Sequence, residues 1–277
     1  VNFLYLDKAP NAQAKRAFDD GRWRSFPMAH RQAVLRKLAD LVEANAEEFA
    51  LYESLDVGKP ISQALQGDIP SVAHHLRSSA ELADKLLAPS GADGSNFSFQ
   101  LRKPIGVVGA IVGWNYPLSL AATKVGPALV MGNSLVLKPS EFTSLSASRL
   151  AELAIEAGVP SGVFNVVHGA GKTVGSALSH HHDVWLLTFT GSSATGKQLM
   201  IAAGKSNMKR VILECGGKSP YLIFDDCPDD LDFLAADIVE TAFGNQGALC
   251  SSSTRLLVQE SLLDKLLPKL VAETEKL

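Results

Sequence analysis

Cysteines are scarce in this sequence: Cys215, Cys227 and Cys250 are three in 277 residues, and none is spaced as a CxxC pair. This scarcity excludes a disulfide framework, so that any functional cysteine is expected to act as a thiol. No run approaches 18 consecutive apolar residues, and we therefore expect no membrane span. The first residues lack a basic stretch followed by an apolar run, which predicts a cytoplasmic protein without a signal peptide.

A basic excess is also missing. The 26 lysines and arginines stand against 29 acidic residues, giving a net charge of -3, whereas binding to a phosphate backbone needs clustered positive charge. We therefore expect no nucleic-acid partner. With 46% hydrophobic and 20% charged residues, the composition is that of a globular protein.

The first part of the chain is expected to be helical. Val34, Leu38, Leu41, Val42 and Ala46 recur with a period near 3.6 residues, and a second helical run is predicted over Ile61–Leu87. A turn-rich segment follows, with Phe97, Phe99 and Leu101 in alternation, which predicts an exposed hairpin or edge strand between Ser90 and Pro104.

From Ile105 onward, short runs rich in valine, isoleucine and leucine alternate with helical stretches. This alternation predicts a doubly wound α/β fold with a parallel, Rossmann-like sheet, preceded by the N-terminal helices. In such sheets ligands bind beyond the carboxyl ends of the strands. The expected strands are Val107–Val112, Ser134–Leu137, Val163–Val167, Val184–Phe189 and Val211–Leu213 with Tyr221–Phe224, and the expected helices are Pro117–Met131, Ser144–Ala157, Thr173–Ser179 and Ala194–Ala203.

Polar motifs follow the first two strands. After the first, Asn115 could donate a hydrogen bond to a developing oxyanion, or it could simply cap the helix that begins at Pro117. After the second, Lys138 and Glu141 flank a proline turn, where a carboxylate could bind ribose hydroxyls and repel a 2′-phosphate. The alternative for this second motif is a solvated loop.

Two later strands end in glycine-rich turns. Thr190–Lys197 opens a helix whose N-terminus could hold an anion, although its spacing is neither that of a dinucleotide fingerprint nor of a P-loop, and an ordinary turn is the alternative. Glu214 ends an apolar strand before Gly216 and Gly217 and could act as a general base, or it could be a solvated strand-end residue.

Cys250 lies at the end of a helical run among small and polar residues. It is a candidate nucleophile, although buried thiols that merely pack are common. The run His180–His182 lacks neighbouring ligands and is expected at the surface, so no metal site is predicted.

The order of these motifs resembles the aldehyde dehydrogenase superfamily from about Ala17 to the C-terminus. The motifs that carry the resemblance are Trp114-Asn115-Tyr116-Pro117, Lys138-Pro139-Ser140-Glu141, Phe189-Thr190-Gly191-Ser192, Glu214-Cys215-Gly216-Gly217-Lys218 and Asn245-Gln246-Gly247 with Cys250. Two further segments, Gly58–Ile61 and Ser206–Val211, are similar to the subgroup that oxidises aminoaldehydes or γ-glutamylaminobutyraldehyde.

This resemblance implies the roles of individual residues. Cys250 matches the nucleophile, Glu214 the general base and Asn115 an oxyanion donor, with Lys124 near that site. The implied cofactor is NAD, which Glu141 favours over NADP. The residues matched to cofactor binding are Trp114, Lys138, Glu141, Gly171, Gly191, Ser192 and Gly196.

The implied reaction oxidises a small-molecule aldehyde to a carboxylic acid. The Cys250 thiolate forms a thiohemiacetal and then a thioester, which is hydrolysed with Glu214 as base. Gly244 and Thr123 fall where relatives commonly have bulkier aromatics, which predicts a preference for extended aldehydes.

The resemblance also implies a division into domains. Residues 1–213 match the NAD-binding domain, with 88–104 as a hairpin arm for homo-oligomerisation in a full-length form, and residues 214–277 match the truncated beginning of a catalytic domain. Because family chains are nearly twice as long, the alternative is a catalytically silent nucleotide-binding or structural relative. Pro268 in the last amphipathic run predicts that the final helix ends or kinks early.

Overall fold

The computed structural model describes residues 10–86 and 89–277. The chain divides into two compact units, Val1–Glu214 and Cys215–Leu277, and each is described by itself below.

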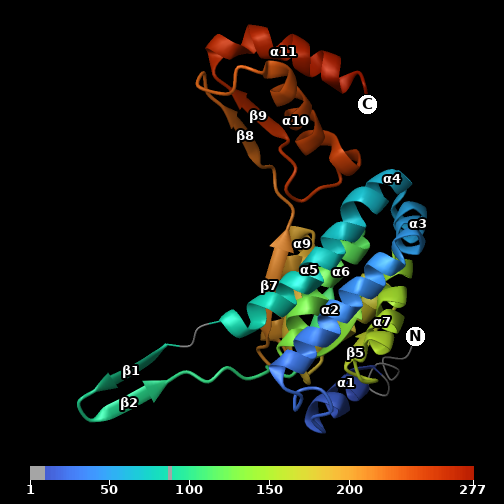
Figure 1. The fold of residues 1–277 in the computed structure, drawn as a ribbon, viewed down its shortest axis with the longest axis vertical. Helices are drawn as coiled ribbons and strands as arrows, with labels where there is room; N and C mark the ends of the chain where they lie inside the picture. The colour runs from blue at the N-terminus through green and yellow to red at the C-terminus, as the bar shows by residue number, and fades with distance from the viewer. Residues whose placement is uncertain (1–9, 87–88) are drawn as a thin grey trace. The chain divides into compact units, whose positions relative to one another are not determined.

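A five-stranded sheet forms the centre of the first unit (Figure 1). Its strands are β3 (Val107–Ile111), β4 (Ser134–Lys138), β5 (Phe164–Val166), β6 (Val184–Gly191) and β7 (Arg210–Cys215), and their order in space is β5-β4-β3-β6-β7. β3 pairs in parallel with β4 and β6, and β4 pairs in parallel with β5. Every residue of β3 and β4 is buried, as expected for strands covered on both faces.

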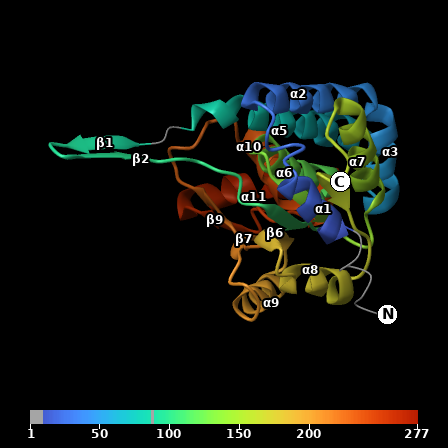
Figure 2. The ribbon, with the colours of Figure 1, turned by 90° about the horizontal axis from the view of Figure 1, so that it is seen from below.

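Helices cover both faces of this sheet. α6 (Pro117–Val130) and α7 (Leu145–Ala157) lie on one face, and α8 (Ser176–His180) and α9 (Ser193–Gly204) lie on the other (Figure 2). The predicted doubly wound fold is therefore confirmed. The helix expected over Thr173–Ser179 begins two residues earlier, with a π-helical turn η4 (Gly171–Gly175), and ends one residue later, at His180 of α8.

In the described part of the chain, five α-helices precede the sheet, of which the second, third and fifth pack on α6 or α7, while the first packs on β3, β4 and β5. They are α1 (Pro10–Asp19), α2 (Met28–Ala44), α3 (Ala46–Val57), α4 (Ile61–Gln63) and α5 (Ile69–Leu82), followed by η3 (Ala83–Lys85). A π-helical turn, η2 (Ala64–Asp68), interrupts the helical run expected over Ile61–Leu87, whose last residue lies outside the described residues. The core between these layers includes Trp23, whose Nε1 donates to the Leu129 carbonyl at 2.8 Å.

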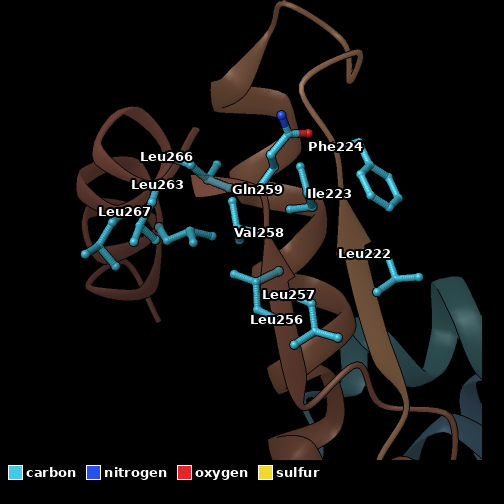
Figure 3. A pocket seen from close by; sticks show the side chains of 11 residues that line it. Leu222, Ile223, Phe224, Leu256, Leu257, Val258, Gln259, Leu263, Leu266 and Leu267 are labelled. Atoms are coloured by element: carbon cyan, nitrogen blue, oxygen red, sulfur yellow. The ribbon is translucent and has the colours of Figure 1, made fainter. Parts of the chain in front are cut away.

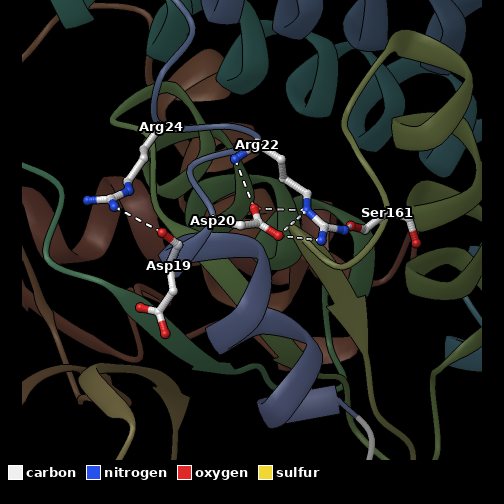
Figure 4. A network of polar contacts seen from close by, with 5 residues as sticks. All are labelled: Asp19, Asp20, Arg22, Arg24 and Ser161. Carbon is white, nitrogen blue, oxygen red and sulfur yellow. Dashed lines mark hydrogen bonds and ion pairs between the residues drawn. The ribbon is translucent and has the colours of Figure 1, made fainter.

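A polar network fixes the turn after α1 (Figure 4). The Arg22 guanidinium bonds the Asp20 carboxylate and also donates to the Ser161 carbonyl at 2.9 Å, while Arg24 donates to the Asp19 carbonyl at 3.1 Å. These bonds tie the segment between α1 and α2 to the loop before β5.

The predicted hairpin consists of β1 (Ser90–Asp93) and β2 (Asn96–Phe99), which pair antiparallel. All eight strand residues are exposed, and the Phe97 and Phe99 rings lie with centroids 5.9 Å apart. The first residue of the predicted arm, Ala88, lies outside the described residues.

The second unit contains a separate two-stranded parallel sheet of β8 (Pro220–Ile223) and β9 (Arg255–Val258). α10 (Leu231–Phe243) packs against α11 (Glu260–Thr274), and the short turn η5 (Gly244–Gly247) follows α10. The expected early end at Pro268 is wrong, because α11 continues through this residue. The buried side chains Leu262 and Leu266 anchor α11, and this packing outweighs the single hydrogen bond that proline removes.

Candidate functional site

The carboxyl end of the central sheet carries most of the predicted site residues of the first unit. After β3 the chain turns through Trp114, which is half-exposed, and Asn115 into α6. A Cβ added at Gly113 would lie 3.4 Å from Asn115 Oδ1 and 3.6 Å from the Thr190 carbonyl, which brings Asn115 to the ends of β3 and β6. The N-cap residue of α6 is Tyr116, one position after Asn115.

Lys138 and Glu141 lie together at the end of β4. The Lys138 ammonium is buried and donates to the Pro139 carbonyl and to Glu141 Oε2, both at 2.9 Å. Glu141 Oε1 accepts a hydrogen bond from the Gly171 amide at 3.3 Å, so that three predicted cofactor residues from two loops meet here. The Lys138 hydrogen bond holds the pKa of the Glu141 carboxyl below its ordinary value. The alternative for this motif, a solvated loop, is wrong for Lys138, because this lysine is only 2% exposed.

The third predicted cofactor turn joins β6 to α9. Ser192 is the N-cap of α9, and its hydroxyl oxygen accepts from the Thr195 amide at 3.2 Å. A Cβ at Gly191 would lie 2.5 Å from the Phe189 ring, so this position needs a residue without a side chain. Gly196 is buried on α9. The free amides of this helix start can hold an anion.

Lys124 and Glu214 complete the predicted residues of the first unit. Burial lowers the pKa of the Lys124 ammonium, and the negative charge of Glu214 opposes that shift. Glu214 lies near the end of β7 and is exposed, so water can reach its carboxylate. The ends of β3, β4, β6 and β7 therefore all carry residues that the sequence predicts for the site.

Cys250 lies in the second unit, in a loop that follows η5. It is partly exposed, and η5 before it contains Asn245 and Gln246, whose φ angles of 50° and 61° are both left-handed. Strained backbone of this kind is common at functional sites. Asn245 is buried and its Nδ2 donates to the Ala248 carbonyl at 3.4 Å, which supports the turn.

Downstream of Cys250 the loop is tied to the end of α10. The buried Ser252 hydroxyl donates to the Ala242 carbonyl at 2.9 Å and lies 3.3 Å from the Thr241 carbonyl, to which the Ser253 amide also donates at 3.2 Å. Sequence reasoning missed Ser252. The signal that could have found it is the run of small hydroxyl residues directly after the candidate nucleophile.

An apolar pocket of about 630 Å³ lies on the second unit (Figure 3). Side chains of β8, β9 and α11 line it, and Gln259 supplies the one polar side chain of this lining. This pocket contains none of the predicted catalytic residues and no pair of titratable groups, so we do not assign the chemistry to it.

Metal-binding clusters and membrane-spanning helices are absent from residues 10–86 and 89–277. Within them, no group of three or more histidine, cysteine or acidic residues is placed to hold a metal ion. None of the helices described is long and apolar enough to cross a membrane.

Comparisons with known proteins bear on this arrangement. The model of the aldehyde dehydrogenase family matches residues 7–277. The NADP/NAD-dependent aldehyde dehydrogenase PuuC of Escherichia coli strain K12 is 50% identical over 98% of this chain and 54% of its own length.

Solved structures of aldehyde dehydrogenases match the chain as well. A γ-glutamyl-γ-aminobutyraldehyde dehydrogenase of Burkholderia cenocepacia J2315 is 46% identical with a TM-score of 0.93, over 96% of this chain and 54% of that chain. An indole-3-acetaldehyde dehydrogenase of P. syringae in complex with NAD⁺ is 49% identical with a TM-score of 0.94, over the same two shares. The predicted likeness to the aminoaldehyde subgroup is thus confirmed, and the chain spans about half the length of the relatives it matches.

Proposed function

Because this chain belongs to the aldehyde dehydrogenase family, we propose that it takes part in the NAD-dependent oxidation of an aldehyde to a carboxylic acid. The observation that carries the proposal is the cluster of Lys138, Glu141 and the Gly171 amide after β4, together with the helix start at Ser192 after β6. A carboxylate suits ribose hydroxyls, and a helix start suits a pyrophosphate.

These residues fit the cofactor. A Cβ at Gly171 would meet nothing within 4 Å, which leaves room for a ligand above the Glu141 carboxylate. In the proposed complex Glu141 binds a ribose, Ser192 and the amides of α9 face the phosphates, and Trp114, Lys138, Gly191 and Gly196 shape the site. Bound NAD supplies the acceptor for the hydride that leaves the substrate carbon.

The remaining chemistry is proposed for side chains of this chain. The Cys250 thiolate attacks the aldehyde carbon, and Asn115 together with the Cys250 amide donates to the resulting oxyanion. After loss of hydride a thioester remains on Cys250. Glu214 then removes a proton from water, which attacks the thioester and releases the acid and the thiolate. Lys124 adds positive charge near this site.

The test follows NADH fluorescence with a panel of aldehydes. We expect NADH formation by the wild-type chain and none by Cys250→Ala, while Cys227→Ala, the matched thiol control in the second unit, keeps the wild-type rate. Titration calorimetry measures NAD⁺ and NADP⁺ separately, because PuuC is named as a user of both. Background rates from all three proteins with intact NAD⁺ binding would instead support the alternative, a catalytically silent nucleotide-binding or structural relative.

The substrate is proposed to be an extended aldehyde. The support is the name of the Burkholderia relative and the small residues Thr123 and Gly244. We expect a higher kcat/KM for 4-aminobutyraldehyde than for acetaldehyde, and the reverse order would refute this choice.

The exposed β1–β2 hairpin is proposed as the arm that joins subunits of a homo-oligomer. Its support is the row of exposed side chains at Phe97, Phe99 and Leu101.

A further inference from the structure

Helix α3 carries two carboxylates one helical turn apart, at Glu53 and Asp56. Glu53 Oε1 accepts a hydrogen bond from the Leu118 amide at 3.2 Å, and Asp56 Oδ2 accepts one from the Leu145 amide at 3.0 Å. Leu118 lies in the first turn of α6 and Leu145 begins α7. The N-cap residues of both helices make no side-chain capping bond of their own, so α3 supplies the cap for each.

The two capped helices directly follow the two strands whose ends carry predicted site residues. Asn115 precedes Leu118 by three residues, and Glu141 precedes Leu145 by four. A change in the first turn of either helix therefore moves a site residue with it, because the intervening chain is too short to absorb the displacement.

A second contact reaches the same turn of α6 from the segment after α3. The buried Lys59 ammonium lies 4.1 Å from the centroid of the Tyr116 ring and forms an ion pair with Asp68 of η2 at 2.5 Å. Lys59 is itself held near α3, because the Ser54 hydroxyl donates to its carbonyl at 2.8 Å. The Tyr116–Leu118 turn thus rests on two buried charged side chains.

Burial of a carboxylate as complete as that of Glu53, which is 0% exposed, normally opposes folding. A buried charged group at such a site can instead serve specificity of structure or function. The position of Glu53 under the Asn115 turn gives it such a role.

We propose that Glu53 and Asp56 are positioning residues, which hold the first turns of α6 and α7 and thereby fix the Trp114–Asn115 and Lys138–Glu141 segments. This proposal rests on the proposed function only for what those two segments bind. The hydrogen bonds themselves can be tested without any activity.

The experiment measures amide hydrogen exchange by mass spectrometry on the whole chain at pH 8, with variants of Glu53 and Asp56. We expect protection of residues 113–121 to fall about 3-fold in Glu53→Gln and 10-fold or more in Glu53→Ala, because glutamine keeps a neutral acceptor and alanine keeps none. Residues 141–149 should respond in the same graded way to Asp56→Asn and Asp56→Ala. The matched control is Glu47→Gln, an exposed carboxylate of the same helix.

Two further readouts separate positioning from a general structural role. Glu53→Gln is expected to raise the urea midpoint at pH 8 while it weakens the 113–121 segment, because the buried charge is gone but the cap is poorer. A fall in protection spread evenly over the first unit, or unchanged protection of 113–121, overturns the proposal. NAD⁺ affinity should weaken in parallel, and a chain that binds no NAD⁺ while showing the local exchange change refutes the proposed function and leaves the positioning role supported.

Discussion

Ionisation of Glu53 should make the stability of the first unit depend on pH. Burial raises the pKa of the Glu53 carboxyl from its ordinary value of 4.5 to about 7. The Ser146 hydroxyl, the Lys59 charge and the Leu118 amide act in the opposite direction, and the charge of Asp68 adds to the increase. These groups belong to α7, to the turn after α3, to α6 and to η2.

The sign of the effect follows from proton binding. Since the pKa is higher in the folded state, the folded protein holds the proton more tightly. This tighter binding adds to the free energy of unfolding, and the added stability is fully present below pH 4.5. It is lost as the pH rises to about 7, above which both states are ionised. The difference between the two pKa values of Glu53 corresponds to about 3 kcal/mol of unfolding free energy. Glutamine does not titrate, so Glu53→Gln should exceed the wild type by only about 1 kcal/mol near pH 5 and by about 3 kcal/mol at pH 8.

Urea unfolding followed by tryptophan fluorescence measures this difference, because Trp23, Trp114 and Trp185 all lie in the first unit. The difference in unfolding free energy between Glu53→Gln and the wild type is plotted against pH from 5 to 8. Glu47→Gln should give a flat line near zero. A flat line for Glu53→Gln as well would refute the reasoning, since it would mean that the carboxyl titrates alike in both states.

Three other perturbations are expected to act locally. Lys138→Met removes the ammonium that holds Glu141 and should weaken NAD⁺ binding about 10-fold or more in calorimetry. Ser252→Ala loses the hydroxyl bonded to the end of α10, which should lower the free energy of unfolding of the second unit by about 1 kcal/mol. The rate of Cys250 alkylation, measured by peptide mass spectrometry, should rise in this variant. Phe97→Asp places charge on the exposed hairpin and should shift the sedimentation coefficient towards that of a smaller assembly.

Each of these variants has a matched control. Lys172→Met, an exposed lysine of η4, should leave NAD⁺ affinity unchanged, and an equal loss there would attribute the Lys138 effect to net charge. Ser251→Ala alters the exposed neighbour of Ser252, and equal alkylation rates in both serine variants would contradict the role of the buried hydroxyl. Ser95→Asp adds the same charge at the hairpin turn, so unchanged sedimentation of Phe97→Asp would count against the arm.

The sequence predicts the sheet well because its signals are local. β3 and β4 are continuous apolar runs, and strands buried on both faces need such runs whatever packs on them. The glycine-rich turn after β6 is also recognisable from the sequence, and the structure gives a reason for its first glycine, because a Cβ at Gly191 would collide with the Phe189 ring. Hydrophobic periodicity predicts the form and the ends of a helix less well where tertiary packing determines them. Neighbouring helices influence the π-helical turns η2 and η4 and the continuation of α11 through Pro268. A local sequence pattern does not contain this information.

Glu53 and Asp56 show where such reading must fail. As residues of a helix they look like ordinary solvent-facing acids, and capping patterns direct attention to the residue just before a helix. Here the caps of α6 and α7 come from positions 65 and 89 residues earlier in the chain. Their hydrogen bonds to the first turns of both helices can be recognised only from the packing of α3 in the structure. A screen of helix starts for acceptors supplied by distant elements would therefore find positioning residues that motif searches pass over.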